Sequence, residues 1–199
     1  GPRRAPNAAN WVPDPDRFTL IPVNARKAYA ALVGKQSALQ DWSVAHEVNR
    51  LSIQGNGRPG ILVSGIAWNY LLEALGDRLA GYNVLRIGAY PLPIEKIRSL
   101  LDASSEVHVV EEGYPFIERY VSALGLMRER RILGKLTGDL PRTGELGPDA
   151  IRRCFGLPVA PALQVPGLAD VQVGRPPRLC DKCPHTDAYL AIQEVVATL

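Results

Sequence analysis

Two cysteines near the end of the chain have a spacing that is typical of metal chemistry. Cys180 and Cys183 form a Cys-x-x-Cys motif, and two thiolates at this spacing can bind one zinc ion or one iron of a cluster. Cys154 is the only other thiol, and His185 lies one residue too far along for the haem-attachment pattern Cys-x-x-Cys-His. The residues alone leave two alternatives open: a metal motif whose other ligands lie outside this chain, and an inert pair.

Two glycine-containing segments have the composition of ligand-binding loops. Gly55-x-Gly57-x-x-Gly60 has the letters of the dinucleotide fingerprint, but that motif must follow a strand and begin a helix, whereas this one precedes a strand. We interpret it as a plain turn. Ser64-Gly65 does follow a strand and precede a helix, yet no phosphate-binding lysine comes after it. A tight turn with Ser64 as the helix cap is favoured over a ligand loop.

Neither the paired carboxylates nor the isolated histidines form a catalytic group. Glu111 and Glu112 end a predicted strand, and adjacent residues of a strand point to opposite faces. We therefore expect a solvent-facing or helix-start role for them and no acid–base pair. His46 and His108 lack acidic or cysteine partners at metal-ligand spacing, so we expect both to be structural. The chain is predicted to hold no catalytic and no cofactor-binding residue.

The elements that must position these residues follow an α/β pattern. Three apolar runs at 61–63, 84–87 and 107–110 are each followed by a helix-length amphipathic segment, at 67–79, 94–101 and 115–124. This alternation predicts a three-layer, doubly wound and mainly parallel sheet. Residues 131–136 are expected to add an edge strand, and 148–155 a last short helix.

The two ends of the chain have different compositions. Five prolines in residues 1–22 predict an extended arm, and a helix is expected from Asn24, as its cap, to about Asn49, with a break near Gly34. Residues 157–178 carry five more prolines and read as a linker, and a helix is expected at 188–199.

Composition excludes several functional classes. The chain has 199 residues, 46% of them apolar and 22% charged, and a net charge of +3. Charges of both signs are interspersed, which gives no reason to expect nucleic acid or an anionic membrane as a partner. Three cysteines do not make a disulfide framework, and no apolar stretch approaches the roughly 20 residues of a membrane span. We expect a reducing, cytoplasmic location.

Five segments carry a resemblance to a known family. Three lie in the predicted domain, at Gly60–Tyr70, Ala89–Pro93 and Val109–Glu118, and two more specific ones follow, at Leu133–Glu145 and Arg175–His185. Together they resemble the alpha subunit of indolepyruvate (2-oxoacid):ferredoxin oxidoreductases, collinearly from about residue 18 onward. The chain departs from the family at one point, because Asp181-Lys182 stands where members typically have Pro-Gly between the cysteines.

The resemblance implies a structural and docking domain within a larger enzyme. Family members oxidatively decarboxylate aryl 2-oxoacids to acyl-CoA with thiamine diphosphate, Mg²⁺ and [4Fe–4S] clusters, and pass the electrons to ferredoxin. The expected partners are other domains of the same subunit, the smaller beta subunit and ferredoxin. Cys180 and Cys183 would be cluster ligands only in the intact parent.

The resemblance also implies where the domains divide. The expected parts are an arm and helix at 1–58, a transketolase C-terminal-like domain at 59–157, a linker at 158–178 and the incomplete start of the thiamine-diphosphate domain at 179–199. The alternative is a stand-alone flavodoxin-like module that binds a nucleotide or a protein, since a fold does not fix a function.

Overall fold

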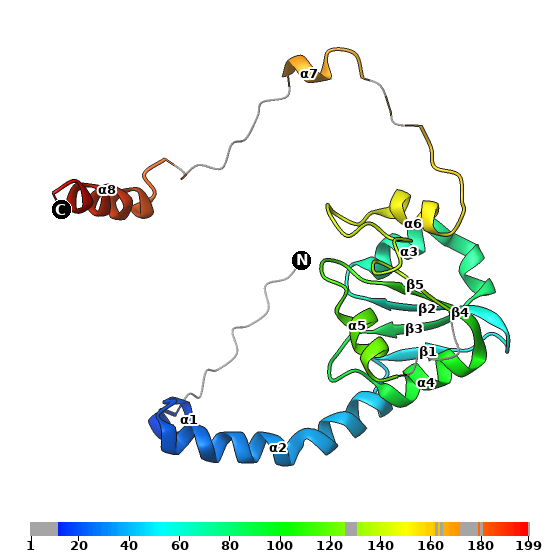
Figure 1. Ribbon diagram of the computed structural model, residues 1–199, viewed down its shortest axis with the longest axis horizontal. Coiled ribbons are helices and arrows are strands. Elements are labelled where there is room, and N and C mark those ends of the chain that lie inside the picture. The colour runs from blue at the N-terminus through cyan, green and yellow to red at the C-terminus, as the bar shows by residue number, and fades with distance from the viewer. Residues whose placement is uncertain are drawn as a thin grey trace, which may run out of the picture. The chain divides into compact units, whose positions relative to one another are not determined.

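A mixed sheet forms the centre of the domain. The computed structural model describes residues 12–125, 131–161, 163, 165–171, 179 and 181–198. Within these residues the sheet has five strands in the order β1-β3-β2-β4-β5 (Figure 1). The bounds are Arg50–Ser52 for β1, Arg58–Ser64 for β2, Asn83–Ile87 for β3, Ser104–Val110 for β4 and Arg131–Leu133 for β5.

The three strands expected from the apolar runs are parallel and adjacent. β2 pairs in parallel with both β3 and β4, and β5 pairs in parallel with β4, as expected for an edge strand. β1 was not predicted, and it pairs antiparallel to β3. The register shifts between Arg58 and Gly60, at Pro59, which has no amide hydrogen to donate.

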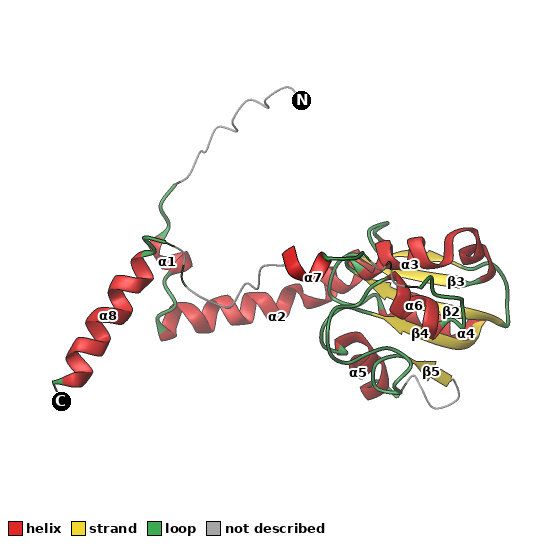
Figure 2. Ribbon diagram, turned by 90° about the horizontal axis from the view of Figure 1, so that it is seen from above, coloured by secondary structure: helices red, strands yellow, loops and turns green. Residues whose placement is uncertain are grey.

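Helices cover both faces of the sheet and make three layers (Figures 1 and 2). On one face, α3 (Ala67–Leu75) and α6 (Pro148–Cys154) pack over a core that includes Ile61 and Val63. On the other face, α4 (Ile94–Ala103) and α5 (Phe116–Ala123) pack over Leu62 and its neighbours. Successive residues of β2 are therefore buried on opposite faces, and the doubly wound α/β fold expected from the sequence is confirmed.

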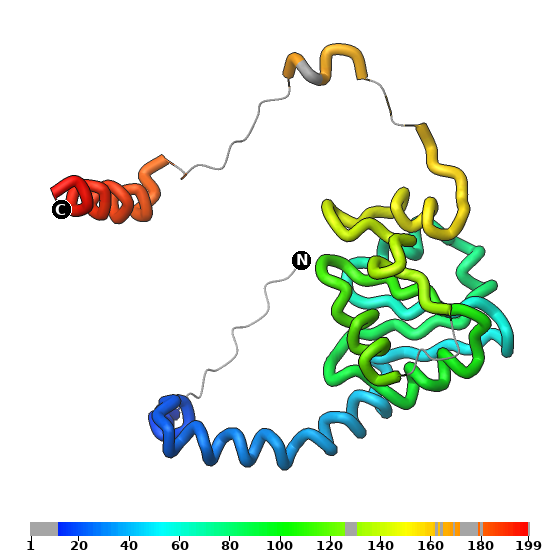
Figure 3. The backbone as a smooth tube through the Cα atoms, in the orientation of Figure 1, coloured from blue at the N-terminus to red at the C-terminus, as the bar shows by residue number. Residues whose placement is uncertain are grey.

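The chain reverses its winding direction at the middle of the sheet. From β2 it passes through α3 and the 3-10 helix η1 (Gly76–Gly81) to β3, and then returns through α4 to β4 on the other side of β2 (Figure 3). The connection that leaves β2 leads to β3 on one side, and the connection that leaves β4 leads to β5 on the other side. These two connections therefore run in opposite directions. In open α/β sheets, ligands bind outside the carboxyl ends of the strands at such a point.

The long helix before the sheet differs in two ways from the prediction. α2 runs from Pro22 to Ala45, after the short α1 (Pro15–Phe18), and it continues without a break through Gly34. It starts at a proline, which needs no hydrogen-bond acceptor in the first turn, so Asn24 is not its cap. Of its residues only Ser43 is buried, which leaves most of its apolar side chains exposed.

A buried asparagine attaches the end of α2 to the sheet. The Asn49 side chain is fully buried, and its Nδ2 donates to the Ser43 carbonyl at 3.0 Å and to Ser43 Oγ at 2.8 Å. Its Oδ1 accepts the amides of Gly88, at 2.9 Å, and Ala89, at 3.1 Å. One side chain thus joins the α2 end, the start of β1 and the loop after β3.

Contacts divide the chain into two units, residues 1–159 and 160–199. The described part of the second unit holds α7 (Leu168–Val171) and α8 (Pro184–Ala197), so the final helix begins four residues earlier than expected. Nine of the 21 residues expected to be a linker, 158–178, lie outside the described residues, and the described part of that segment includes α7. Among the described helices, none is both long and apolar enough to cross a membrane.

Candidate docking surface and buried polar centre

A buried carboxylate at the carboxyl end of β4 organises the start of α5. Glu111 is 3% exposed, and its two oxygens accept the amides of Ile117, at 2.9 Å, and Glu118, at 3.0 Å. Burial raises the pKa of this carboxyl, and the backbone amides that it accepts oppose the shift. Of the two roles expected for Glu111, helix start and solvent exposure, the structure shows the first.

A second buried carboxylate holds the loop after β5. Glu118 is 1% exposed, and it accepts the amide of Lys135 at 2.9 Å and that of Leu136 at 3.1 Å. Lys135 is 2% exposed, and its Nζ donates to the Gly113 carbonyl at 2.6 Å. The Glu118 carboxylate and the Lys135 amine are therefore hydrogen-bonded to backbone groups, and they are not free to act as a general acid or base.

The two glycine-containing loops differ in how far they match the expected geometry. The Gly57 amide donates to the Ala103 carbonyl at 2.8 Å with φ at +78°, which is the turn expected there. Ser64 ends β2 and does not cap α3, because the residue before that helix is Ile66 and no side chain caps it. The prediction of a Ser64 cap was wrong because Gly65, with φ at +59°, and Ile66 separate the strand from the helix.

A cysteine, a histidine and a glutamate lie in the order of a catalytic triad, but their charge states do not support catalysis. Cys154 Sγ is 3.7 Å from His108 Nδ1, and His108 Nε2 is 3.6 Å from Glu106. Burial raises the pKa of Cys154 to about 11 and lowers that of His108. An activated pair needs a thiolate beside an imidazolium, whereas both shifts favour the neutral thiol and the neutral imidazole.

Four aromatic side chains form an exposed surface over the same edge of the sheet. Tyr90 follows β3, and Tyr114, Phe116 and Tyr120 lie at or in α5; their exposed fractions run from 42% to 58%. The Tyr90 and Phe116 rings meet edge to face at 5.8 Å, and the Phe116 and Tyr120 rings are 6.3 Å apart. We call these four residues the aromatic surface.

The aromatic surface has the composition of a protein interface. The Arg119 guanidinium lies 4.9 Å from the Tyr114 ring centre, and tyrosine, phenylalanine and arginine are enriched in interface cores. Burial, and then the Glu111 charge, raises the pKa of Tyr90, so its hydroxyl stays neutral and can donate. Exposed apolar patches on protein surfaces are often sites of association.

Comparison with known proteins shows what the chain is related to. No family model matches it. It is 34% identical over 98% of its length to the indolepyruvate oxidoreductase subunit IorA of Methanothermobacter thermautotrophicus, and 29% identical over its whole length to IorA of Archaeoglobus fulgidus. The resemblance to IorA is confirmed. The chain spans about one third of these relatives, 32% and 33% of their lengths.

A third relative, the IorA subunit of Methanothermobacter marburgensis, is 32% identical over the whole length of this chain. The chain matches 33% of the length of that subunit. Among solved structures, 2-oxoglutarate:ferredoxin oxidoreductase from Magnetococcus marinus matches 58% of this chain and 21% of its own chain, with 15% identity and a TM-score of 0.43. The relation to IorA therefore rests on sequence.

The described residues do not assemble the predicted cysteine site of this IorA relative. Cys183 lies before α8, with its Sγ 3.3 Å from His185 Nδ1. Cys180 lies outside the described residues. In the part of the chain that the structure describes, no three side chains among His, Cys, Asp and Glu are grouped to hold a metal ion.

Sequence reasoning missed the buried polar centre of this relative of IorA. Glu118 and Lys135 look like ordinary charged residues of an amphipathic helix and a loop, and nothing in their local pattern shows that both are buried. A signal was available in the run Gly134-Lys135-Leu136, where a lysine stands between apolar segments directly after a strand. A buried lysine needs a partner, and the Gly113 carbonyl supplies one.

Proposed function

We propose that this chain is a structural and docking part of an indolepyruvate:ferredoxin oxidoreductase that depends on thiamine diphosphate. The IorA relatives support the enzyme class, and the aromatic surface supports the docking role. In the intact enzyme, arylpyruvates would be oxidatively decarboxylated to acyl-CoA, with electrons passed to ferredoxin. This chain would contribute position and no reacting group.

The occupant proposed for the aromatic surface is another part of the same subunit. The chain accounts for about one third of its relatives' length, so a subunit of that size has two further thirds to cover exposed apolar faces. The aromatic surface and Arg119 offer rigid anchors for such packing. They lie in two adjoining loops and one helix. The smaller beta subunit and ferredoxin would be partners of the whole enzyme.

The two buried carboxylates do not offer a site for the enzyme's Mg²⁺. Mg²⁺ requires free oxygen ligands, but Glu111 and Glu118 are already bonded to backbone amides. Thiamine diphosphate supplies the carbanion chemistry when it is bound. The task proposed for this chain is to support other segments of the subunit, which would hold both groups.

The Cys-x-x-Cys motif is proposed to supply two of the four thiolates of a [4Fe–4S] cluster in the intact subunit. Two thiolates cannot complete the shell alone. The support for this role is the spacing of Cys180 and Cys183, together with the relation of the surrounding chain to IorA. Ligands from outside this chain would complete the site.

The docking role can be tested by substitution at the aromatic surface. We expect Tyr90→Ser combined with Phe116→Ser to leave the melting temperature of this chain nearly unchanged, because both side chains are half exposed. In the intact subunit the same pair should lower the melting temperature and the activity, because aromatic hot spots of an interface each contribute roughly 2 kcal/mol or more.

The matched control is Leu72→Ser, an apolar side chain of α3 that is 42% exposed. It lies on the opposite face of the sheet from α5. Equal behaviour of the control and the aromatic pair in the intact subunit would show that the aromatic surface is not a docking site.

A further inference from the structure

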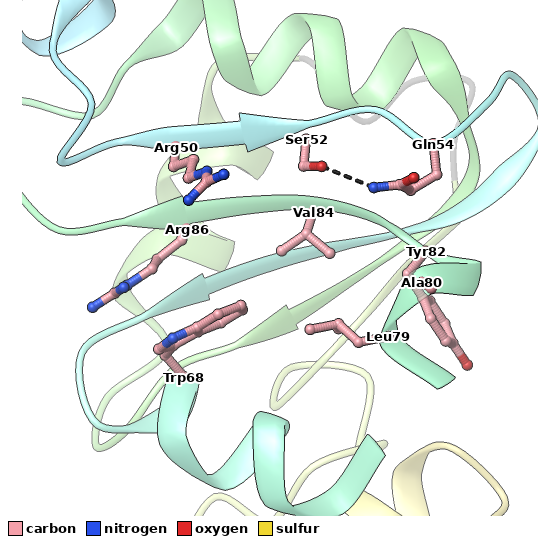
Figure 4. A pocket seen from close by; sticks show the side chains of 9 residues that line it. All are labelled: Arg50, Ser52, Gln54, Trp68, Leu79, Ala80, Tyr82, Val84 and Arg86. Atoms are coloured by element: carbon pink, nitrogen blue, oxygen red, sulfur yellow. Dashed lines mark hydrogen bonds between the residues drawn. The ribbon is translucent and has the colours of Figure 1, made fainter. Parts of the chain in front are cut away.

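A pocket of about 270 Å³ lies between the edge strand β1, β3 and the start of α3, away from the aromatic surface (Figure 4). Val84 is 7% exposed and forms part of its apolar floor. The side chains that matter for its chemistry are Arg50, Gln54, Trp68, Tyr82 and Arg86. Three of them lie in β1, α3 and β3, and Gln54 and Tyr82 lie in the loops next to β1 and β3.

Two arginines lie side by side at one end of this pocket. Arg50 of β1 and Arg86 of β3 are direct partners in the antiparallel register, so their side chains leave the same face of the sheet. Neither has an ion pair or a side-chain hydrogen bond to another described residue, and no acidic residue lines the pocket. Like charges placed directly opposite destabilise a sheet, and folding alone gives no reason for the pair.

One aromatic ring lies beside this pair, and another lies at the opposite end of the pocket. The Arg86 guanidinium carbon is 5.4 Å from the centre of the Trp68 ring, which holds the cation next to a flat apolar surface. At the other end of the pocket, Tyr82 is held edge to face against Phe155, with ring centres 5.4 Å apart. Ser52 of β1 and Gln54, two residues after it, add polar groups, joined by a hydrogen bond of 2.9 Å (Figure 4).

The arginines lie near the start of α3. Arg86 is the last but one residue of β3, and Trp68 lies in the first turn of α3, directly after the carboxyl end of β2. The pocket lies beside β1 and β3, away from the switch point between β2 and β4, so its side chains and not its place in the fold argue for a ligand. The amino end of α3 also adds partial positive charge on this side.

We propose that this pocket binds a small molecule in which a planar ring carries a carboxylate or a phosphate. The anion pairs with Arg50 and Arg86, and the ring lies against Trp68 and the apolar floor. Arginine donates in a fork that matches both anions, so one site suits either. The proposal does not rest on the docking role, because the pocket and the aromatic surface share no residue.

Binding can be followed by the fluorescence of Trp68. The chain has three tryptophans, so Trp11→Phe with Trp42→Phe leaves Trp68 as the single reporter. The probes are phenyl phosphate and 3-phenylpropionate, with inorganic phosphate and the neutral 3-phenylpropanamide as their matched partners. We expect saturable changes with at least one anionic aromatic probe at roughly millimolar concentration, as is usual for ligands of this size.

Substitution of the arginines should identify the anion site. Arg50→Gln and Arg86→Gln are each expected to weaken binding about tenfold or more, because each removes a charged hydrogen-bond donor. The control is Arg98→Gln, an exposed arginine of α4 that pairs with Glu95 outside the pocket. Circular dichroism would verify that each variant is folded.

The outcomes separate the parts of the proposal. The tighter of the two aromatic probes identifies the preferred anion, and binding of either one supports the site. Absence of saturable binding, binding unaffected by both arginine variants, or equal affinity for 3-phenylpropanamide would overturn the anion site. Equal affinity for inorganic phosphate and phenyl phosphate would overturn the role of the ring.

Discussion

Buried polar side chains inside the domain connect its loops through hydrogen bonds to backbone groups. Asn83 is fully buried, and its Oδ1 accepts the Gln54 amide at 2.8 Å while its Nδ2 donates to the Gly55 carbonyl at 3.0 Å. Glu111 and Glu118 have the same kind of role at the opposite edge. Each of these buried groups is satisfied by backbone six or more residues away in the sequence, as buried polar groups usually are.

Replacement of Glu118 by glutamine should destabilise the domain. The amide keeps one acceptor oxygen, but its NH₂ group would face the backbone amides of Lys135 or Leu136, which now donate to the carboxylate. A buried donor left without an acceptor costs about 1–3 kcal/mol. Urea unfolding of the variant should show a loss of this size at an unchanged slope.

The comparison for that measurement is Glu95→Gln on the exposed surface of α4. Glu95 pairs only with Arg98, at 3.0 Å, and both side chains are more than half exposed. Its replacement should change the free energy of unfolding by less than about 0.5 kcal/mol. If the two variants unfold at the same urea concentration, the Glu118 network does not stabilise the domain.

At the scale of elements, the sequence predicted what depends on local pattern and missed what depends on packing. The apolar runs of β2, β3 and β4 were found because strands buried on both faces are apolar throughout. β1 was missed because Arg50, Leu51 and Ser52 form a three-residue edge strand without an apolar run, and only pairing with β3 makes it a strand.

Helix ends were predicted less well than helices, for a similar reason. The continuity of α2 through Gly34 was missed, since one glycine costs a helix only about 1 kcal/mol and neighbouring turns can offset it. The aromatic surface was not predicted either, because Tyr90 and Phe116 come together only when the loops after β3 and β4 meet.

The junction between α2, β1 and β3 depends on a glycine. A Cβ on Gly88 would lie 2.7 Å from the carbonyl oxygen of Val48 and 2.8 Å from Val48 Cγ2. Because the first of these is backbone, Gly88→Ala must displace the chain and weaken the Asn49 hydrogen bonds to Gly88 and Ala89. We expect a loss of roughly 1–3 kcal/mol in the free energy of unfolding.

The matched control is Gly34→Ala in α2, where a Cβ would meet nothing within 4 Å. In an exposed helix this change is expected to stabilise by about 0.5–1 kcal/mol. The two alanine variants should therefore shift the thermal midpoint in opposite directions. A Gly88→Ala protein as stable as the parent chain would show that the junction is not closely packed.

At the scale of the whole molecule, the exposed apolar faces of α2 and α8 indicate that the chain has packing partners. Residues of α8 that include Tyr189, Ile192 and Val196 are each about 60% exposed, and α2 presents further exposed apolar side chains. Solvent-exposed helices rarely carry such residues without a partner. These faces agree with a chain that accounts for one third of the length of its IorA relatives, and they support the proposal that neighbouring segments cover them.

The Cys-x-x-Cys motif gives the prediction that depends most on the intact subunit. If Cys180 and Cys183 hold part of a [4Fe–4S] cluster there, Cys180→Ser and Cys183→Ser should each lower the iron content and the reduced-cluster signal. Ferredoxin reduction should fall with them, because a cluster that has lost a thiolate ligand is incomplete. Iron analysis, electron paramagnetic resonance and ferredoxin reduction by the intact enzyme measure the three quantities.

Cys154→Ser provides the control for this experiment within the same chain. Cys154 is held beside His108 in the domain, and burial raises the pKa of its thiol to about 11. A thiol that stays protonated is a poor metal ligand, so its replacement should leave the iron content unchanged. Cys180 and Cys183 are not cluster ligands if their serine variants keep the iron content and the electron transfer of the Cys154 variant, and the motif would then only shape the turn before α8.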